Sequence, residues 1–216
     1  MTAFTRWCLV ALGVVLLISV PIVVSARPAH DQTISAAALF AEVRAAKTHS
    51  YSGDVETNGD LALPVDQRFT DIGSLFGERN QLRVWWRTSR EWRVDKLLPT
   101  GETDLIHYAR STSQWDYEQD AVRSGADPDI RLPRTSDLLP PALGNRLLQD
   151  VKAGDLTRLP ARRVAGLDAL GLRLSPAAPQ SSIDHVDLWA DPATGVPVRV
   201  EVYAKGEQSP SFTSAF

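Results

Sequence analysis

The sequence predicts an α+β fold that consists mostly of antiparallel β-sheet and follows an apolar amino-terminal helix. Three observations lead to this prediction. A run of twenty uncharged residues lies near the start of the chain, at Trp7–Ala26. Apolar residues recur with helical spacing in two later segments. The remaining runs are of strand length, and the polar breaks between them are too short for the crossover that a parallel pair of strands requires.

Length, charge and cysteine content exclude several classes of protein. The chain has 216 residues and a formal net charge of -3. This length suffices for a domain with a buried core. The slightly acidic balance gives no electrostatic basis for nucleic-acid binding, so no nucleic-acid partner is expected. Cys8 is the one cysteine of the sequence, which excludes an intramolecular disulfide framework and a zinc cluster built on cysteine pairs.

Residues 1–30 are predicted to be a membrane anchor or a signal segment. Twenty helical residues span about 30 Å, the thickness of a bilayer's hydrocarbon core, whereas signal peptides have an apolar region of ~7–15 residues. The length therefore favours an uncleaved anchor through residues 7–26, and cleavage after Ser25-Ala26 is the alternative. We expect a single-pass protein of the cell membrane with residues 31–216 outside the cytoplasm, or a secreted protein if the segment is cleaved.

The first half of the domain begins with a predicted helix at Thr33–Lys47, in which Thr33 or Ser35 caps the first turn. The apolar period then changes to two. Strands are expected at Tyr51–Asn58, Gln81–Thr88, Glu91–Leu98, Thr103–Ala109 and Ser113–Glu118. Their short connections predict antiparallel neighbours and exclude a doubly wound nucleotide-binding sheet for this half.

The second half is expected to begin with a long loop at Gln119–Thr135 and a helix at Ser136–Lys152, which Pro140-Pro141 interrupts. Strands follow at Leu170–Leu174, Ile183–Ala190, Pro197–Tyr203 and Ser211–Phe216. Asp191–Gly195 has the residue types of a tight turn, because proline presets φ and glycine permits a positive φ. In the strand after this turn, valines alternate with polar residues, which predicts a sheet with one covered face and one wet face.

Tryptophans are concentrated in the predicted strands, at Trp85, Trp86, Trp92, Trp115 and Trp189. Because neighbouring residues on a strand point to opposite faces, Trp85 and Trp86 cannot both be interior. Alternation places Trp86 on one face with Leu82 and Val84, and Trp92 on one face with Val94. These rings either fill a core or line an apolar concavity, and alternation does not distinguish the two arrangements.

Catalytic motifs are absent from the sequence, which contains no HExxH, no GxSxG and no phosphate-binding glycine loop. The spacing of His185 and Asp187 allows a metal site or a His–Asp pair, and His107 is close in sequence to Glu102 and Asp104. Solvated strand faces explain both groups. We therefore expect no enzyme activity, no cofactor and no metal site.

The segment Ile183–Val200, with the sequence IDHVDLWADPATGVPVRV, resembles the strand–turn–strand signature of the lipoprotein carrier superfamily. This superfamily includes the LolA-like carriers and the RseB-like sigma-factor regulatory proteins. Tyr51-Ser52-Gly53, the pair Leu82–Trp86 and Trp92–Val94, and Leu170–Pro176 agree with the resemblance, in the expected order. The resemblance implies an antiparallel half-barrel, that is a curved sheet, over residues 31–216, with helices packed on its concave face.

In this superfamily the concave face holds acyl chains of a lipid or lipoprotein, and RseB-like proteins control a membrane-bound anti-sigma factor. The resemblance therefore implies acyl chains as ligands and an anti-sigma factor as a partner. Apolar residues of the strands and of the Leu138–Leu148 lid would form the ligand-binding wall. These residues are Val84, Trp86, Trp92, Val94, Trp115, Leu139, Leu143 and Leu147.

Two features depart from the superfamily. The chain stops at Phe216 inside a predicted strand, where RseB-like proteins continue into a second domain, so we expect a fragment truncated at its C-terminus or a shortened member. An uncleaved anchor also differs from the freely diffusing carriers.

Two functions follow. One is an extracytoplasmic, membrane-anchored lipid- or lipoprotein-binding carrier or sensor. The other is a membrane-anchored interaction module that regulates an anti-sigma factor without a lipid ligand.

Overall fold

Eleven strands form one antiparallel sheet in the computed structural model, which describes residues 3–25, 28–61, 70–128 and 130–216. The strands are β1 (Tyr51–Gly59), β2 (Asn80–Thr88), β3 (Glu91–Leu97), β4 (Glu102–Tyr108), β5 (Ser111–Asp116), β6 (Ala121–Ala126), β7 (Leu156–Val164), β8 (Leu167–Leu174), β9 (Ile183–Ala190), β10 (Pro197–Ala204) and β11 (Phe212–Ala215). The α-helices are α1 (Ala3–Ser25), α2 (Ala36–Ala45), α3 (Thr70–Gly77) and α4 (Pro140–Leu147). Short 3-10 turns are η1 (Ala46–Thr48), η3 (Thr135–Leu138) and η4 (Ala153–Asp155).

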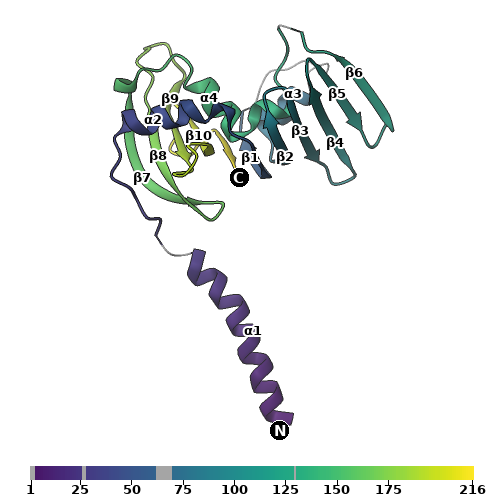
Figure 1. Cartoon of the computed structure of the whole chain (residues 1–216), viewed down its shortest axis with the longest axis vertical. Helices are drawn as coiled ribbons and strands as arrows, with labels where there is room; N and C mark the ends of the chain where they lie inside the picture. Colours follow the sequence, from purple (N-terminus) through teal and green to yellow (C-terminus); the bar gives the residue numbers. More distant parts are fainter. Residues whose placement is uncertain (1–2, 26–27, 62–69, 129) are drawn as a thin grey trace.

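The last strand completes the middle of the sheet. The strand order is β6-β5-β4-β3-β2-β1-β11-β10-β9-β8-β7, so β11 lies between β1 and β10. Figure 1 shows the result as two wings, β1–β6 and β7–β10, with α2 crossing the second wing and α4 lying between them. The sheet is not closed, since β6 and β7 are its two edges. This architecture agrees with the predicted antiparallel half-barrel.

Two apolar clusters form where side chains of the sheet meet the helices. On the β7–β10 wing, Leu39, Phe40 and Val43 of α2 pack against alternate residues of β8–β10. On the β1–β6 wing, Leu138 and Leu139 pack against alternate residues of β2 and β3. We call the side of the sheet that carries these contacts the helix-bearing face, and the opposite side the outer face.

Two strands of the structure are absent from the sequence-based prediction. The loop predicted at Gln119–Thr135 contains β6, and no strand is predicted where β7 lies. Both strands are edges of the sheet, where pairing on one side and shallow burial leave little apolar alternation. β7 also contains Pro160, beside a register shift between Leu159 and Arg162. Proline is tolerated there because an edge strand has N–H groups without a partner in the sheet.

The bounds of the predicted helices are too wide. α2 begins after Ser35, which accepts a hydrogen bond from the backbone N–H of Ala38 at 3.1 Å and is the predicted cap. The helix predicted at Ser136–Lys152 is α-helical only over α4. Pro140 and Pro141 begin this helix and do not interrupt it, because the first turn of a helix needs no N–H donor from them.

The outer face is not wet throughout, so that prediction is wrong on the β7–β10 wing. Asp187 and Glu201 point away from the helices, yet each is only 4% exposed. Arg173 donates two hydrogen bonds to Asp187, at 2.6 and 2.7 Å. Arg162 and Arg199 both donate to Oε1 of Glu201, at 2.8 and 2.7 Å. Paired arginines therefore replace water around both carboxylates.

The amino-terminal helix α1 carries exposed apolar side chains, Trp7 and Leu17 among them. In the described part of the chain, no helix is both long enough and apolar enough to cross a membrane. Residues 26–27 and the side chains of residues 20–25 lie outside the described part. The anchor through residues 7–26 stays a prediction.

Candidate functional site

Four rings from neighbouring strands stack in a row on the helix-bearing face. The register pairs Tyr51 with Trp86, Trp86 with Trp92, and Trp92 with His107. The ring centroids are 5.7, 5.4 and 5.1 Å apart, and the adjacent ring planes differ by 4°, 3° and 11°. Directly opposed residues on adjacent strands are the closest side-chain neighbours in a sheet, so the register itself builds the stack. We call these four residues the aromatic ladder.

Both ends of the aromatic ladder are held by further contacts. At one end, the ring of Phe216 meets Tyr51 edge-on, with centroids 5.9 Å apart. Burial raises the pKa of the Tyr51 phenol, which therefore stays neutral over the physiological range. At the other end, Nδ1 of His107 lies 2.9 Å from Oγ1 of Thr112. The ladder is thus held at one end by Phe216, which follows β11, and at the other by Thr112 of β5.

Arg134 lies over the Trp92 ring, with its guanidinium carbon 5.0 Å from the ring centroid, a distance at which a cation–π attraction operates. The same guanidinium donates hydrogen bonds to both carboxylate oxygens of Asp127, at 3.1 and 2.9 Å, and to Oγ1 of Thr112 at 3.0 Å. The hydrogen bonds from Arg134 lower the pKa of Asp127 to about 2. A charged pair therefore closes over one part of the ladder.

The ladder borders a hollow of about 640 Å³ at the ends of β1–β4. Trp92 is buried, whereas Trp86 is only half-buried. Residues of the outer face also line the hollow, among them Ile106 and Tyr108, which are exposed and alternate with His107 along β4, so the hollow is bordered by both faces of the sheet. Arg87 and Glu91, an exposed ion pair 3.2 Å apart, lie among its lining residues. Aromatic walls with a few polar groups are typical of sites for small ligands, and this combination suits an apolar chain with a polar head.

Several residues predicted for the binding wall lie directly beside the ladder. Val84 and Val94 face the helices one row further along β2 and β3, and they are paired in the register. Both are fully buried, as is Leu139, and all three belong to the same cluster as Trp92. In this structure they are core residues under a closed cover, so access to them requires the cover to move.

The remaining lid residues connect the two wings. Leu143 of α4 is half-buried and contacts both apolar clusters. Among the described residues, Leu147 packs against the β7–β10 cluster and not against the other, and it borders a separate hollow of about 290 Å³ beside β8 and β9. The predicted lid therefore spans the sheet and does not lie over the ladder alone.

Trp115 does not share a face with the other wall residues. The register places it opposite Asp104, whereas Leu105 and His107 are the residues of β4 that join the helix-bearing face. Trp115 lies on the outer face and meets Tyr117 with centroids 5.9 Å apart. The prediction of one wall that includes Trp115 is wrong because the position of each strand relative to its neighbour decides which residues share a face.

Two ladder residues, Tyr51 and His107, are missing from the predicted wall. Tyr51 is the first residue of a predicted strand. It is four residues before Val55, so alternation would have placed both side chains on the buried face. His107 is grouped in the sequence analysis with Glu102 and Asp104, but it lies on the opposite face from Asp104 because the two are three residues apart on one strand. The register between strands brings both rings next to Trp86 and Trp92, and the sequence of a single strand does not indicate this register.

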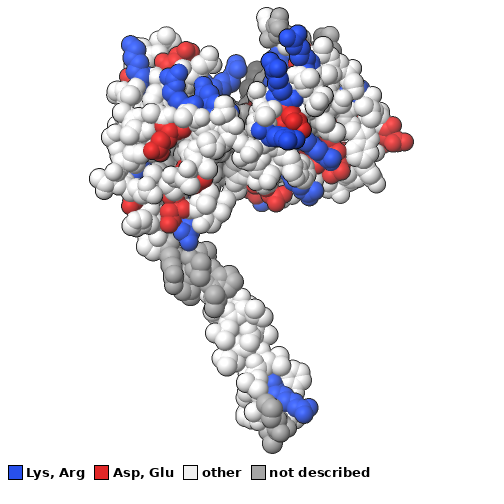
Figure 2. Space-filling model, viewed as in Figure 1, with Lys and Arg blue, Asp and Glu red and all other residues white. Residues whose placement is uncertain are grey.

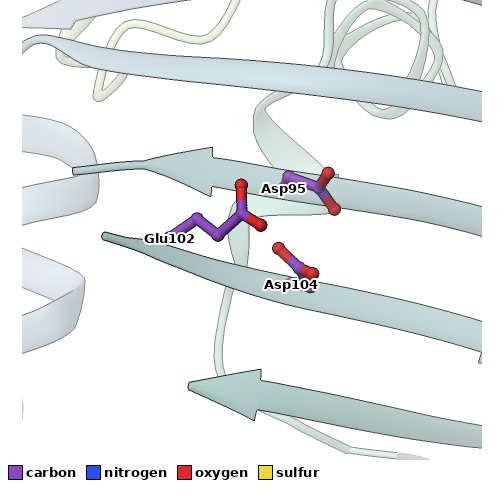
Figure 3. Close-up of side chains that lie close together, drawn as sticks. All are labelled: Asp95, Glu102 and Asp104. Carbon is purple, nitrogen blue, oxygen red and sulfur yellow. The ribbon is translucent and has the colours of Figure 1, made fainter. Parts of the chain in front are cut away.

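A cluster of three carboxylates lies on the outer face of β3 and β4. Figure 3 shows Asp95 on one strand and Glu102 and Asp104 on the next, with the carboxyl groups of Glu102 and Asp104 turned toward each other. Arg93 donates hydrogen bonds to both oxygens of Asp95, at 2.6 and 2.9 Å, and to Oδ2 of Asp104 at 2.8 Å. Burial and the carboxylate of Asp95 raise the pKa of Asp104 to about 6.

Comparisons with known proteins identify the fold. No protein-family model and no curated protein sequence matches the chain. Among solved structures, the crystal structure of MucB matches with a TM-score of 0.56 and 17% identity, over 84% of this chain and 56% of MucB. The MucA/MucB complex of Pseudomonas aeruginosa matches with a TM-score of 0.54 and 18% identity, over 84% of this chain and 55% of the matched chain. The chain thus spans little more than half the length of these two structures, and it has a MucB-like, that is RseB-like, fold.

Proposed function

We propose that the domain is a binding protein, not an enzyme, and that the aromatic ladder holds an acyl chain of a lipid or lipoprotein. The observation that carries the proposal is the half-buried Trp86, which stacks on Trp92 and borders the 640 Å³ hollow. Each CH2 group that leaves water for an apolar site gains roughly 0.8 kcal/mol. A few methylene groups against the ladder would therefore bind measurably.

The hollow beside the aromatic ladder is a better site for the first contact with an acyl chain than the adjacent row of Val84 and Val94. Val84 and Val94 are sealed by Leu139, whereas the ladder reaches the surface through Trp86. An acyl chain would enter along Trp86. Its polar head would lie near Arg87 and Glu91, which are exposed.

We propose that α1 anchors the domain in the cell membrane, with the domain outside the cytoplasm. The exposed apolar side chains of α1 support this arrangement, because so large an apolar surface is unfavourable in water. Figure 2 shows the described side chains of α1 as mainly uncharged, with basic atoms near the beginning of the helix. On the same view, acidic and basic side chains are interspersed over the described part of the domain.

We further propose that the domain acts as a sensor with an anti-sigma factor as its protein partner. An anchored protein cannot ferry cargo between membranes, which favours a sensor over a carrier. The solved structures of MucB with MucA support a protein partner for this fold. Because the chain spans only part of MucB, the partner's binding surface is part of the proposal.

A second function, an interaction module without a lipid ligand, is favoured by the closed cover. Leu138 and Leu139 are almost wholly buried, and the backbone carbonyl of Leu138 accepts a hydrogen bond from the Ser214 hydroxyl at 2.5 Å. A cover fixed in this way gives a rigid surface on which a partner protein can dock. In this function the ladder would stabilise the core alone.

The two functions differ in where lipid contacts the protein. Cells that express the full chain are given a photo-crosslinkable fatty acid, and the crosslinked peptides are mapped by mass spectrometry. The lipid-binding function predicts crosslinks on β1–β3 peptides that contain Tyr51, Trp86 or Trp92, besides those on α1. Crosslinks on α1 alone would contradict it and favour the interaction module.

A further inference from the structure

The outer face of β3 and β4 carries a concentration of negative charge that the function proposed above does not use. Glu102 and Asp104 are two residues apart on β4 and therefore share a face. The register places Asp95 of β3 directly opposite Asp104. One carboxylate oxygen from each of the three side chains lies within 4.8 Å of the others. Two adjacent strands thus bring three acidic side chains to one point.

Arg93 compensates this charge only in part. Its guanidinium pairs with Asp95 and Asp104, which sets one positive charge against three carboxylates. Arg83 is opposite Asp95 in the register, but its ion pair is with Asp54, at 3.6 Å. The cluster therefore has an excess of negative charge. Charges of one sign held this close are costly when water is largely excluded.

One oxygen of the cluster lacks any hydrogen-bond partner within the described residues. Asp104 is 1% exposed, and its Oδ1 is buried and unpartnered, while its Oδ2 accepts from Arg93. A buried acceptor without a partner costs about 1–3 kcal/mol, and more when it is charged. When Asp104 is ionised, such an oxygen is stabilised by a cation or by a donor from outside the chain. Glu102 is half-buried, so the cluster has a side open to solvent.

We propose that Asp95, Glu102 and Asp104 bind a divalent cation, specifically Ca2+. Ca2+ takes 6–8 oxygen ligands at about 2.3–2.6 Å. Two ligands of one ion can then be no more than roughly 5.2 Å apart, and the observed limit of 4.8 Å satisfies this. Three carboxylates supply part of the shell, and water enters from the Glu102 side to complete it. Mg2+ fits less well because it demands near-ideal octahedral geometry at shorter distances.

Terbium luminescence tests the site in the full chain, purified in detergent. Tb3+ replaces Ca2+ at oxygen sites and emits when a nearby tryptophan is excited, and Trp115 lies opposite Asp104 on the same face. We expect saturable Tb3+ emission that Ca2+ displaces with a dissociation constant on the order of 0.1–1 mM, as in extracellular calcium modules. Mg2+ should displace it more weakly.

Two variants and one matched control make the test specific. Asp104→Asn removes the charge of the unpartnered carboxylate with little change in shape, and Glu102→Gln changes the half-buried ligand in the same way. Each should weaken Tb3+ and Ca2+ binding at least about tenfold. Asp187→Asn is the control, because Asp187 is also a buried strand aspartate paired with an arginine, and it should leave binding unchanged. The proposal is overturned if Ca2+ up to about 10 mM fails to displace Tb3+, or if both cluster variants bind like the parent.

Discussion

Trp86 and Trp92 stack face to face across β2 and β3, with ring centroids 5.4 Å apart and planes within 3° of parallel. The two residues are directly opposed in the register. Both line the hollow, but they differ in exposure, since Trp92 is buried under Arg134 and Trp86 is only half-buried. In the proposed function, the Trp92 ring therefore supports the fold and the Trp86 ring would meet the acyl chain.

This difference in exposure predicts different costs for removing the two rings. Trp92→Ala should lower the free energy of unfolding by ~3–5 kcal/mol, because it empties a core position. Trp86→Ala should cost about 2 kcal/mol or less, because its ring is only half-buried. Urea denaturation of both variants measures this. Equal costs would mean that Trp86 is also an ordinary core residue and would count against a ligand role.

The turn between β9 and β10 predicts a large effect of Gly195→Val. Gly195 has φ of +71°, and a Cβ at this position would lie 2.6 Å from the carbonyl oxygen of Glu42 in α2. The positive φ alone costs roughly 1–3 kcal/mol for a residue with a side chain, and the contact with Glu42 adds to it.

Gly206→Val is the matched control for this prediction. Gly206 has φ of +86°, but no atom lies within 4 Å of where its Cβ would be. Gly206→Val should therefore show the cost of the backbone conformation only. Thermal unfolding of the two variants separates the cost of the positive φ from the cost of the contact with Glu42. Equal destabilisation would show that α2 shifts to accommodate the new side chain.

The pair of Asp127 and Arg134 predicts a loss of stability in acid. Arg134 lowers the pKa of Asp127 from its ordinary value of 3.8 to about 2. A carboxyl group whose pKa is lower in the folded state stabilises the protein above its unfolded pKa, and this contribution disappears as the pH falls from about 4 to 2. We expect the parent to be roughly 2 kcal/mol more stable than Asp127→Asn at pH 7.

This prediction is checked by measuring, as a function of pH, the difference in the free energy of unfolding between the parent and Asp127→Asn. The gap between the parent and Asp127→Asn should close as unfolding is followed down to pH 2. Asp54→Asn, at an exposed carboxylate of β1, should show a small gap at every pH. A gap between the parent and Asp127→Asn that persists unchanged at pH 2 would show that the ion pair with Arg134 is not its source.

The amino-terminal prediction concerns processing. The full chain should remain in the membrane fraction after an alkaline carbonate wash, and its mature amino terminus should lie before Trp7. Sequencing of the mature amino terminus checks this directly. A soluble protein that begins at Arg27 would show that the segment is a cleaved signal.

Most of the sheet could be predicted because buried strands carry their own signal. The alternation of Leu82, Val84 and Trp86 identifies both the strand β2 and its buried face. The edge strands β6 and β7 lack such alternation, because few of their side chains are buried. The buried charges of the outer face could not be predicted, since Arg173 of β8 covers Asp187 and Arg162 of β7 joins Arg199 in covering Glu201.

The candidate site could be predicted in part, for a related reason. The alternation of side chains along each strand placed Trp86 and Trp92 on the helix-bearing face. Joining them to Tyr51 and His107 requires the register between strands, and hairpin lengths alone do not fix it. The same lack of register led to the wrong face for Trp115.

Binding of a fluorescent fatty acid to the full chain in detergent-free membranes tests the central claim most directly. The parent should bind the probe at micromolar concentration, and Trp86→Ala should weaken binding at least about tenfold while its circular dichroism stays that of the parent. Trp115→Ala, on the outer face, should bind like the parent. No binding by the parent, or equal binding by Trp86→Ala, would contradict the claim that the aromatic ladder holds an acyl chain.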